Sequence, residues 1–235
     1  MMLAGMQPYF FPYLGYFALI KLSDLFIIAD SFQYIERGWI DRNRILKPGD
    51  GWQYIRVPLV KHSHKIMIKD VEIRVDEPWR DRIYRQLEHY KRIAPYYKQV
   101  ISFLHVALSL NTDNISILNT HLLDETCRYI DIPFNSKWFS ELDLDIADAM
   151  KADEWALNTC KALGYSTYIN PPGGESFYDK SKYDKSHIDL RFLKVNLKNY
   201  HQGRSIFEEA LSIIDVMMFN TPSEIRAMLD DYQLL

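Results

Sequence analysis

The sequence predicts an α/β fold with a mainly parallel, Rossmann-like sheet flanked by helices. Three observations predict it. The first thirty residues alternate strand, helix and strand, the second of these strands is short and wholly apolar, and the second half of the chain resumes the alternation. A wholly apolar strand is typical of a parallel sheet that helices cover on both faces. We expect a single domain over residues 1–235, with a helical insertion at about 77–131.

The first thirty residues predict a βαβ unit. Leu3–Tyr9 is apolar enough to form a buried strand, and Pro12 follows it. Tyr13–Leu22 carries apolar residues at helical spacing and is expected to end at Ser23-Asp24. Leu25–Ala29 forms the second strand. Two strands joined by one short helix are predicted to be parallel, with a right-handed crossover.

The next segment is predicted to contain little regular structure. Ser31–Gly51 is polar, aromatic and basic without clear periodicity, which indicates a long loop or a hairpin. Trp52–Pro58 is predicted to be a strand that its proline ends. Lys65–Val75 alternates apolar and polar residues with one break in phase near Asp70, which predicts a strand with a bulge.

Helices are predicted to follow this segment. Pro78 and Pro95 suit the first turn of a helix, where the missing N–H costs nothing. Asn111–Asp113 supplies capping side chains for a third helix. The three helices are expected over residues 78–92, 95–110 and 111–130.

The second half of the chain alternates strands and helices again. Gly164 is expected to be a C-cap, because glycine readily adopts the left-handed conformation that closes a helix. The proline- and glycine-rich run 171–174 predicts a turn. The predicted strands are Phe134–Trp138, Ser166–Ile169 and Leu190–Val195, and the predicted helices are Ile146–Leu163, Ile206–Met218 and Pro222–Leu229.

Composition excludes several classes of protein. The formal net charge is −3, which argues against nucleic acid as a partner. Cys127 and Cys160 form no C-x-x-C pair and are expected to be reduced and buried. The first twenty residues lack a basic start and contain Pro8 and Pro12, so a signal peptide is not expected. No apolar run reaches the roughly 18 residues of a membrane span. We expect a cytoplasmic protein.

Charge is distributed unevenly along the chain. Residues 35–69 contain eight Lys or Arg and three Asp or Glu, whereas residues 131–160 contain seven acidic and two basic residues. A solvated surface explains many such runs. The basic run directly follows the predicted βαβ unit, so docking of an acidic acyl-carrier protein is an alternative.

Polar side chains follow both strands of the βαβ unit. Gln7 and Tyr9 lie near the carboxyl end of the first strand, and Asp30 and Gln33 near that of the second. Open α/β sheets bind ligands at this edge. We expect Gln7 and Tyr9 to orient a substrate and Asp30 to accept a proton, while Gly15 would permit close approach near the helix start. The alternative is that Asp30 and Gln7 only satisfy loop amides.

Two arginines lie two residues apart after the βαβ unit. In an extended segment Arg42 and Arg44 would point the same way, and their forked donors suit a phosphate or a carboxylate. Trp39 would supply an apolar wall, and Asn43, which lies between the arginines, is a further candidate for substrate binding. Surface ion pairs with neighbouring acidic residues are the alternative.

His62-Ser63-His64 supplies two histidines on one short segment. Such a pair can ligate a metal, and a histidine can act as a base near pH 7. No third ligand is evident, so His62 and His64 are candidate catalytic residues, and solvent-exposed histidines are the alternative.

Two shorter motifs are less specific. Asp143-Leu144-Asp145 matches the D-x-D pair that many sugar-nucleotide glycosyltransferases use for a divalent cation, but acidic residues are also common before helices. We predict no metal site. Gly173 and Gly174 would let backbone amides approach a ligand, or they would form a plain turn.

The sequence lacks the motifs of several common enzyme classes. It contains no P-loop, no G-x-G-x-x-G, no H-E-x-x-H and no G-x-S-x-G. Standard NTPase, dinucleotide, zincin and hydrolase-elbow chemistry is therefore not expected. No cofactor is predicted, and a nucleotide or a carrier-bound donor remains compatible with the basic segment.

The segment Met6–Phe17, MQPYFFPYLGYF, resembles the WbqC-like protein family. The similarity spans nearly the whole chain in the expected order. One departure is Asn170–Pro172, where the family has a Ser-Gly-like turn; if that turn touches the ligand, the substrate differs here. Further agreement lies at Asp24, Asp30, Gln33, Arg42–Ile45, Val57-Pro58, Trp79, Tyr90, Ser136, Leu163-Gly164, Tyr168, Gly173-Gly174, Tyr178, Leu211–Asp215 and Asn220.

The resemblance implies a bacterial transferase of surface-polysaccharide (O-antigen) or related secondary-metabolite biosynthesis. We favour acyl or aminoacyl transfer from an activated donor to an amino sugar or an amine. Gln7 and Tyr9 would orient the substrate, Arg42 and Arg44 would hold the donor, and Asp30 or a nearby histidine would accept the proton.

A weaker similarity concerns Tyr13–Tyr16. These residues occupy the place that H-x-G-H has in nucleotidyltransferase folds such as pantothenate synthetase. Both histidines are tyrosines here, Tyr13 and Tyr16, so the similarity supports the fold more than adenylate transfer. A nucleotide-dependent ligase or nucleotidyltransferase, and a non-catalytic partner of a pathway enzyme or carrier protein, are the alternative functions.

Overall fold

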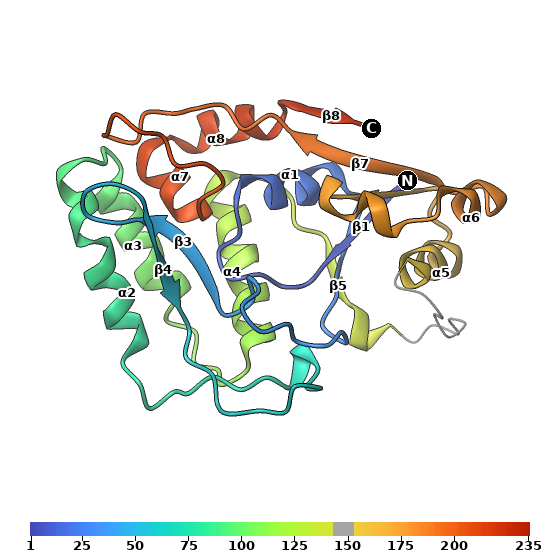
Figure 1. Ribbon diagram of the computed structural model, residues 1–235, viewed down its shortest axis with the longest axis horizontal. Coiled ribbons are helices and arrows are strands. Elements are labelled where there is room, and N and C mark those ends of the chain that lie inside the picture. The colour runs from blue at the N-terminus through green and yellow to red at the C-terminus, as the bar shows by residue number, and fades with distance from the viewer. Residues whose placement is uncertain (143–152) are drawn as a thin grey trace.

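The computed structural model describes residues 1–142 and 153–235 and has a six-stranded sheet at its centre (Figure 1). The strand order is β5-β2-β1-β6-β7-β8, and every neighbouring pair is parallel except β7 and β8. The predicted α/β fold with a mainly parallel sheet is therefore confirmed. The strands are β1 Met2–Met6, β2 Leu25–Ile28, β5 Ser136–Trp138, β6 Thr167–Asn170, β7 Asp189–Val195 and β8 Tyr232–Leu234.

The βαβ unit forms as predicted. β1 and β2 are parallel neighbours, with Leu3 opposite Leu25, and helix α1 (Leu14–Leu22) joins them. All four residues of β2 are buried. The carboxyl end of β1 lies in the middle of the molecule and faces the β3–β4 hairpin (Figure 1).

Side chains of the central strands alternate between two hydrophobic clusters. Leu3, Leu25 and Ile27 belong to a cluster that also contains residues of α5 and α6, whereas Ala4 and Phe26 belong to a larger cluster with residues of α1 and other helices. This period of two places apolar residues on both faces of the sheet, which explains why β2 is wholly apolar.

A two-stranded antiparallel hairpin lies outside the main sheet. It consists of β3 (Arg42–Leu46) and β4 (Trp52–Arg56), with Arg42 opposite Arg56. Gly49 and Gly51 have positive φ angles of 79° and 84° in the turn, which glycine tolerates without strain. The hairpin alternative for residues 31–51 is therefore confirmed for their second half.

The predicted strand over residues 65–75 is wrong. The chain instead forms a 3₁₀ turn, η1 (Ile68–Asp70), at the break in phase. The Ile68 N–H donates to the Phe32 carbonyl and the Lys69 N–H to the Asp30 carbonyl, so loops rather than a strand satisfy this backbone. Isolated β-bridges, such as Leu59 to Ile73, are present in this segment, but the apolar alternation does not produce a continuous strand.

The helices after the hairpin agree with prediction except at the cap of α4; α2 and α3 lie at the left of Figure 1, and α4 lies nearer its middle. Asn114, and not residues 111–113, caps α4, because its side chain accepts from the Ser116 and Ile117 N–H groups. The helices are α2 Trp79–Leu87, η2 Glu88–Arg92, α3 Tyr97–Ala107 and α4 Ile115–Ile130.

One predicted helix begins later than expected, and some short elements were not predicted. The part of the predicted 146–163 helix that the structure describes is α5, which Gly164 closes at φ 72°. Ser212 caps the helix expected from Ile206, so it begins at Ile213. The elements are η3 Phe139–Glu141, α5 Glu154–Leu163, η4 Pro172–Phe177, α7 Ile213–Phe219 and α8 Pro222–Leu229, with α6 Lys180–Lys185 and β8 unpredicted.

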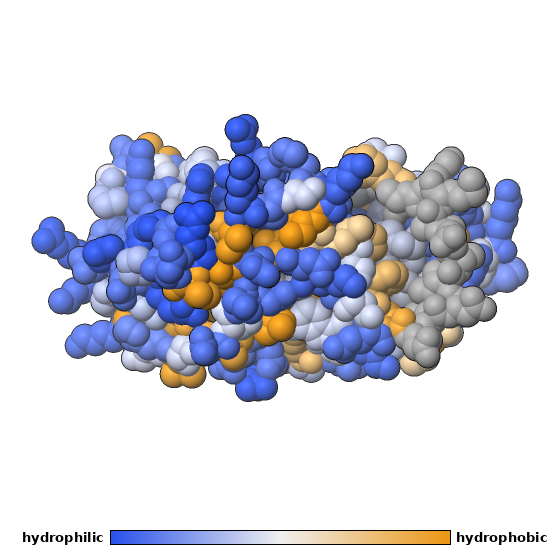
Figure 2. Space-filling view, turned by 90° about the horizontal axis from the view of Figure 1, so that it is seen from below, coloured by the Kyte–Doolittle hydropathy of each residue, from blue (hydrophilic) through white to orange (hydrophobic). Residues whose placement is uncertain are grey.

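The lower face of the molecule carries a narrow band of hydrophobic side chains between hydrophilic ones (Figure 2). Residues 57–78, at the bottom of Figure 1, expose Val60, Met67 and Val75. Both cysteines are buried and free, as expected. Among the residues that the structure describes, no helix could cross a membrane.

A buried carboxylate joins α7 to two tyrosines. Asp215 is completely buried and accepts hydrogen bonds from the Tyr90 hydroxyl (2.5 Å), the Tyr200 hydroxyl (2.6 Å) and the Gln202 amide (3.1 Å). Burial raises the pKa of Asp215 from its ordinary value of 3.8 to about 6, although these donors favour the charged form. The protonated carboxyl is therefore the more stable buried form below pH 6.

We expect Asp215→Asn to change the pH dependence of stability. The folded chain binds the Asp215 proton more tightly than the unfolded chain, so this group stabilises the fold below pH 3.8 and loses that effect as pH rises to about 6. Between these pH values the wild type should lose about 3 kcal/mol of unfolding free energy relative to the variant. Urea denaturation at several pH values measures this. The exposed Asp230→Asn is the control, and equal pH profiles for wild type and Asp215→Asn would contradict the prediction.

Candidate functional site

The loop between β1 and α1 forms the centre of the candidate site. Its backbone carbonyls are bonded by side chains from distant elements. The Tyr16 hydroxyl donates to the Gln7 carbonyl (2.8 Å), and the Ser212 hydroxyl donates to the Phe11 carbonyl (2.8 Å). Carbonyl groups paired in this way hold residues 7–13 in one conformation, although the loop has no regular structure.

Two buried asparagines supply most of these bonds. The Asn43 amide donates to the carbonyls of Phe10 (3.0 Å) and Phe11 (2.8 Å). The Asn119 amide donates to the carbonyls of Pro8 and Ile40, both at 2.8 Å. Asn119 is on α4 and Asn43 on β3, so the loop, the hairpin and the helix are joined at one point.

Backbone strain occurs at the same place. Phe11 and Ala210 have φ angles of 40° and 50°, in the left-handed region that non-glycine residues rarely adopt. Such strain is common at functional sites, where the surrounding structure enforces it. Hydrogen bonds enforce it here, because the Phe11 carbonyl accepts from Asn43 and Ser212, and the Ala210 carbonyl accepts from Arg44 (3.1 Å).

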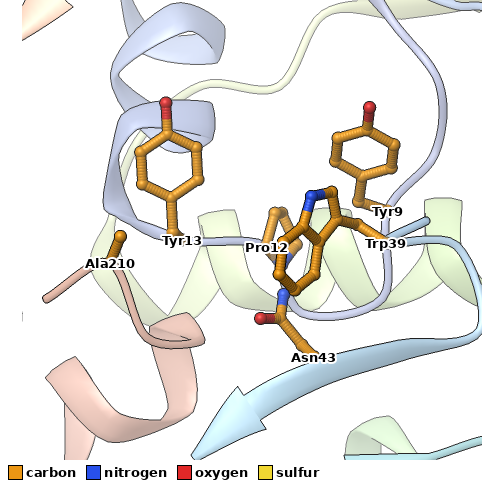
Figure 3. A pocket seen from close by; sticks show the side chains of 6 residues that line it. All are labelled: Tyr9, Pro12, Tyr13, Trp39, Asn43 and Ala210. Carbon is orange, nitrogen blue, oxygen red and sulfur yellow. The ribbon is translucent and has the colours of Figure 1, made fainter. Parts of the chain in front are cut away.

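A pocket of about 250 Å³ opens beside this loop (Figure 3). The phenol rings of Tyr9 and Tyr13 stand on either side of it and point the same way, and the Trp39 indole lies in front of Pro12. Aromatic rings dominate the wall. The lining residues are Tyr9, Pro12, Tyr13, Trp39, Asn43 and Ala210.

Arg44 lies beside this pocket. Its guanidinium is 5.5 Å from the centre of the Trp39 ring and 5.2 Å from that of Trp52, and it donates to the Ala210 carbonyl. Its buried Nε has no hydrogen-bond partner among the described residues. Trp39 and Ala210 both line the pocket, so the charge of Arg44 is at its rim.

Burial changes the acid–base properties of the pocket phenols. It raises the pKa of Tyr9 and of Tyr13, and the proximity of Tyr13 raises that of Tyr9 further. Both phenols are therefore neutral at pH 7 and can donate a hydrogen bond to a ligand. They are not bases.

A second hollow, of about 480 Å³, is polar. Gln7, Gln33, Tyr34, Glu36 and His64 are among its lining residues. The Gln33 amide donates to the His64 carbonyl (2.7 Å), and the His64 Nδ1 lies 3.2 Å from the Glu36 carboxylate. The polar hollow therefore combines an imidazole, a carboxylate and two amides at the carboxyl ends of β1 and β2.

His62 is close to this hollow but is not among its lining residues. Its ring packs edge-on against Tyr34, with 5.0 Å between ring centres, and its Nδ1 lies 3.2 Å from the Ser63 carbonyl. Of the two candidate histidines, only His64 lines the hollow, and its side chain is 87% exposed there, as the alternative of solvent-exposed histidines expects.

Asp30 lies in neither cavity. It is 1% exposed, and its carboxylate accepts from the Ser140 N–H (3.0 Å) and the Ser140 hydroxyl (2.5 Å). Both carboxylate oxygens thus bind the segment that follows β5. This geometry is that of a residue that fixes a loop, the alternative stated for it above.

The remaining candidates support the site or lie away from it. Tyr16 is buried in the core and fixes the Gln7 carbonyl. Gly15 lies under the Tyr13 ring, where an added Cβ would be 2.5 Å from ring atoms. Gly173 and Gly174 lie in η4, after β6, and line neither cavity. Gly15 therefore acts by letting Tyr13 pack against the helix backbone.

The structure thus divides the predicted residues between two cavities. Tyr9, Trp39 and Asn43 meet at the aromatic pocket with Arg44 at its rim, and Gln7, Gln33 and His64 meet at the polar hollow. Tyr13 lies in the quoted family motif, but Ala210 and Ser212 carry no local signal in the sequence. Residues that the sequence did not indicate for the site are Pro12, Tyr13, Asn119, Ala210 and Ser212.

No metal cluster is formed by the residues that the structure describes. Among residues 1–142 and 153–235, no three His, Cys, Asp or Glu side chains come together in a way that could hold an ion. The Asp143-Leu144-Asp145 motif lies outside the described residues.

Sequence comparison places this site in a known family. Residues 7–227 match the WbqC-like protein family. This chain belongs to that family. The match begins at Gln7, at the carboxyl end of β1, and it includes every residue that lines the two cavities.

A similar chain is found in Mycobacterium tuberculosis (strain ATCC 25618 / H37Rv). This relative, the uncharacterized protein Rv1507c, is 32% identical over 224 residues, which cover 94% of each chain. No solved structure matches the chain. The similarity covers nearly the whole of both chains, as the family match does for this one. The name of the relative indicates no substrate.

We expect Asn119→Leu to destabilise the WbqC-like fold. The substitution removes the donor that the Pro8 and Ile40 carbonyls share in the interior. Each unsatisfied buried acceptor costs about 1–3 kcal/mol, so the loss of both bonds should lower the unfolding free energy by about 2–6 kcal/mol. Urea denaturation measures this. Asn135→Leu removes an amide that also donates to a carbonyl but is exposed, and it should cost less than about 1 kcal/mol. Similar losses in both variants would refute the anchoring role.

Proposed function

We propose that this chain is a transferase whose activated donor binds in the aromatic pocket with an anionic group at Arg44. One observation carries this proposal. Arg44 is held between two tryptophans at the rim of an aromatic pocket and has no carboxylate partner among the described residues. Ligand sites commonly combine an apolar wall with a few well-placed polar groups.

The chemistry of the pocket fits a donor with an apolar part and a negative charge. The rings of Tyr9, Tyr13 and Trp39 offer contact surface, and the neutral phenols can donate hydrogen bonds. The forked guanidinium of Arg44 suits a carboxylate or a phosphate.

We place the acceptor, an amine or an amino sugar, in the polar hollow. Gln7 lines the hollow and Tyr9 lines the pocket, and these residues are two apart on one fixed loop. The amine nitrogen would attack the acyl carbon of the donor and form a C–N bond, while the bond to the leaving group breaks. His64, at the hollow, would take the proton from nitrogen and return it to the leaving group.

Membership of the WbqC-like family supports the biological setting of this proposal. We place the reaction in bacterial surface-polysaccharide, O-antigen type, or related secondary-metabolite biosynthesis. The chain would act there on a small-molecule acceptor.

We expect Arg44→Gln to weaken donor binding. Acetyl coenzyme A, acetyl adenylate and acetyl phosphate are suitable probes, because each carries both an acyl group and phosphate: the first is a thioester, and the other two are acyl phosphates. Loss of one charge-assisted contact should raise Kd for the preferred donor by roughly tenfold, measured by calorimetry. Arg74→Gln, on an exposed arginine paired with Glu77, is the control and should leave Kd unchanged. Absence of binding by all three donors would contradict the proposal.

We expect His64→Asn to lower kcat and leave donor Kd unchanged. The imidazole would act only on the acceptor proton, so its removal should cost roughly 10²–10⁴-fold in turnover. Mass spectrometry of glucosamine incubated with the preferred donor measures transfer. His187→Asn, on a histidine after α6, is the matched control. Unchanged turnover in His64→Asn would remove His64 from the mechanism.

A further inference from the structure

The outer face of the β3–β4 hairpin carries three arginines. Arg42 is directly opposite Arg56, and Arg44 is directly opposite Tyr54. Since side chains alternate along a strand, these four lie on one face, and Asn43 points to the other, where its amide bonds the loop after β1. We call Arg42, Arg44 and Arg56 the arginine face.

Aromatic rings hold each guanidinium of the arginine face. Arg42 and Arg56 lie 4.7 Å and 5.1 Å from the centre of the Tyr54 ring, and Arg44 lies 5.2 Å from that of Trp52. Cation–π contacts use the flat side of a guanidinium and leave N–H groups at its edge for other partners. The rings thus fix the positions of the guanidinium groups and leave N–H groups that can donate to an anion.

No carboxylate neutralises the arginine face among the described residues. Arg74, Arg82 and Arg128 each form an ion pair with an Asp or Glu, whereas no ion pair includes a member of the arginine face. The acidic neighbour of Arg42, Asp41, accepts from the Tyr34 hydroxyl at 2.8 Å. The positive charge of this face is therefore not compensated by a carboxylate of these residues.

This arrangement costs stability when no anion is bound. Arg42 and Arg56 are like charges directly opposite each other in a sheet, which is unfavourable. Arg42 is only 9% exposed, so water screens its charge poorly. The one hydrogen bond of the Arg42 side chain among the described residues runs from its Nε to the Gly38 carbonyl, at 3.2 Å. A bound anion would relieve the repulsion between Arg42 and Arg56.

We infer that the arginine face binds a diphosphate, so the donor of the proposed transferase is a diphosphate-bearing molecule. This inference rests on the proposed function, because Arg44 belongs both to the arginine face and to the pocket rim. A nucleoside diphosphate unit, as in coenzyme A thioesters or nucleotide-linked donors, and a lipid diphosphate share this chemistry.

Charge and spacing favour a diphosphate over a carboxylate. A carboxylate neutralises one of three cations, whereas a diphosphate carries two to three negative charges. Arg42 and Arg44 are held over different rings, Tyr54 and Trp52, whose centres are 4.9 Å apart. Two linked phosphoryl groups can reach both guanidiniums, and one carboxylate group pairs well with a single guanidinium.

Calorimetry with inorganic pyrophosphate tests the inference. The full chain should bind pyrophosphate more tightly than orthophosphate or acetate. Arg56→Gln should weaken pyrophosphate binding roughly tenfold, since one charge-assisted contact is lost. Arg56 is exposed, so the Arg56→Gln variant should fold. Arg56→Lys should bind pyrophosphate with intermediate affinity, because lysine keeps the positive charge but lacks the forked N–H donors of arginine. Arg191→Gln, on a surface arginine paired with Asp189, makes the same change in net charge and should bind like wild type.

The outcomes separate this inference from the proposed function. Equal affinity for pyrophosphate and orthophosphate, or unchanged pyrophosphate affinity in Arg56→Gln, overturns the diphosphate assignment even if acyl transfer occurs. Pyrophosphate binding that depends on Arg56, without transfer from any donor, supports the anion site and refutes the transferase. ADP and geranyl diphosphate distinguish a nucleotide source from a lipid source, and failure of both to bind also overturns the assignment.

Discussion

The two buried amides of Asn43 and Asn119 hold the loop after β1, and the candidate site depends on them. Together they donate to three loop carbonyls and to the Ile40 carbonyl. These residues come from the hairpin and from α4, so one hydrogen-bonded junction positions parts of the chain that have no regular structure. The pocket walls follow from it, because Tyr9, Pro12 and Tyr13 are on that loop and Asn43 itself lines the pocket.

The fold was largely predictable because its first two strands are buried on both faces. The wholly apolar run Leu25–Ala29 requires cover on two sides, and two hydrophobic clusters supply it. Prediction failed at residues 65–75, where apolar residues are buried singly and the backbone bonds to loops near Asp30 and Phe32. It also missed α6 and β8, since elements this short depend on tertiary contacts more than on local pattern.

The candidate site was predictable only where its signal is local. Tyr9, Trp39 and the two arginines of β3 are recognisable from chemistry and spacing within a few residues. Asp30 has the same kind of signal, but Ser140, 110 residues away, takes both of its oxygens. Pairings at that distance cannot be inferred from one sequence. Ala210 was missed for the same reason.

The pocket wall comes from three segments far apart in the chain, and this has a consequence for synthesis. Residues 9–13 and 39–43 leave the ribosome early, whereas Ala210, whose carbonyl accepts a hydrogen bond from Arg44, leaves it about two hundred residues after Tyr9. Ser212, which fixes the Phe11 carbonyl, follows it. A nascent chain therefore has no complete pocket until nearly all of it has been translated.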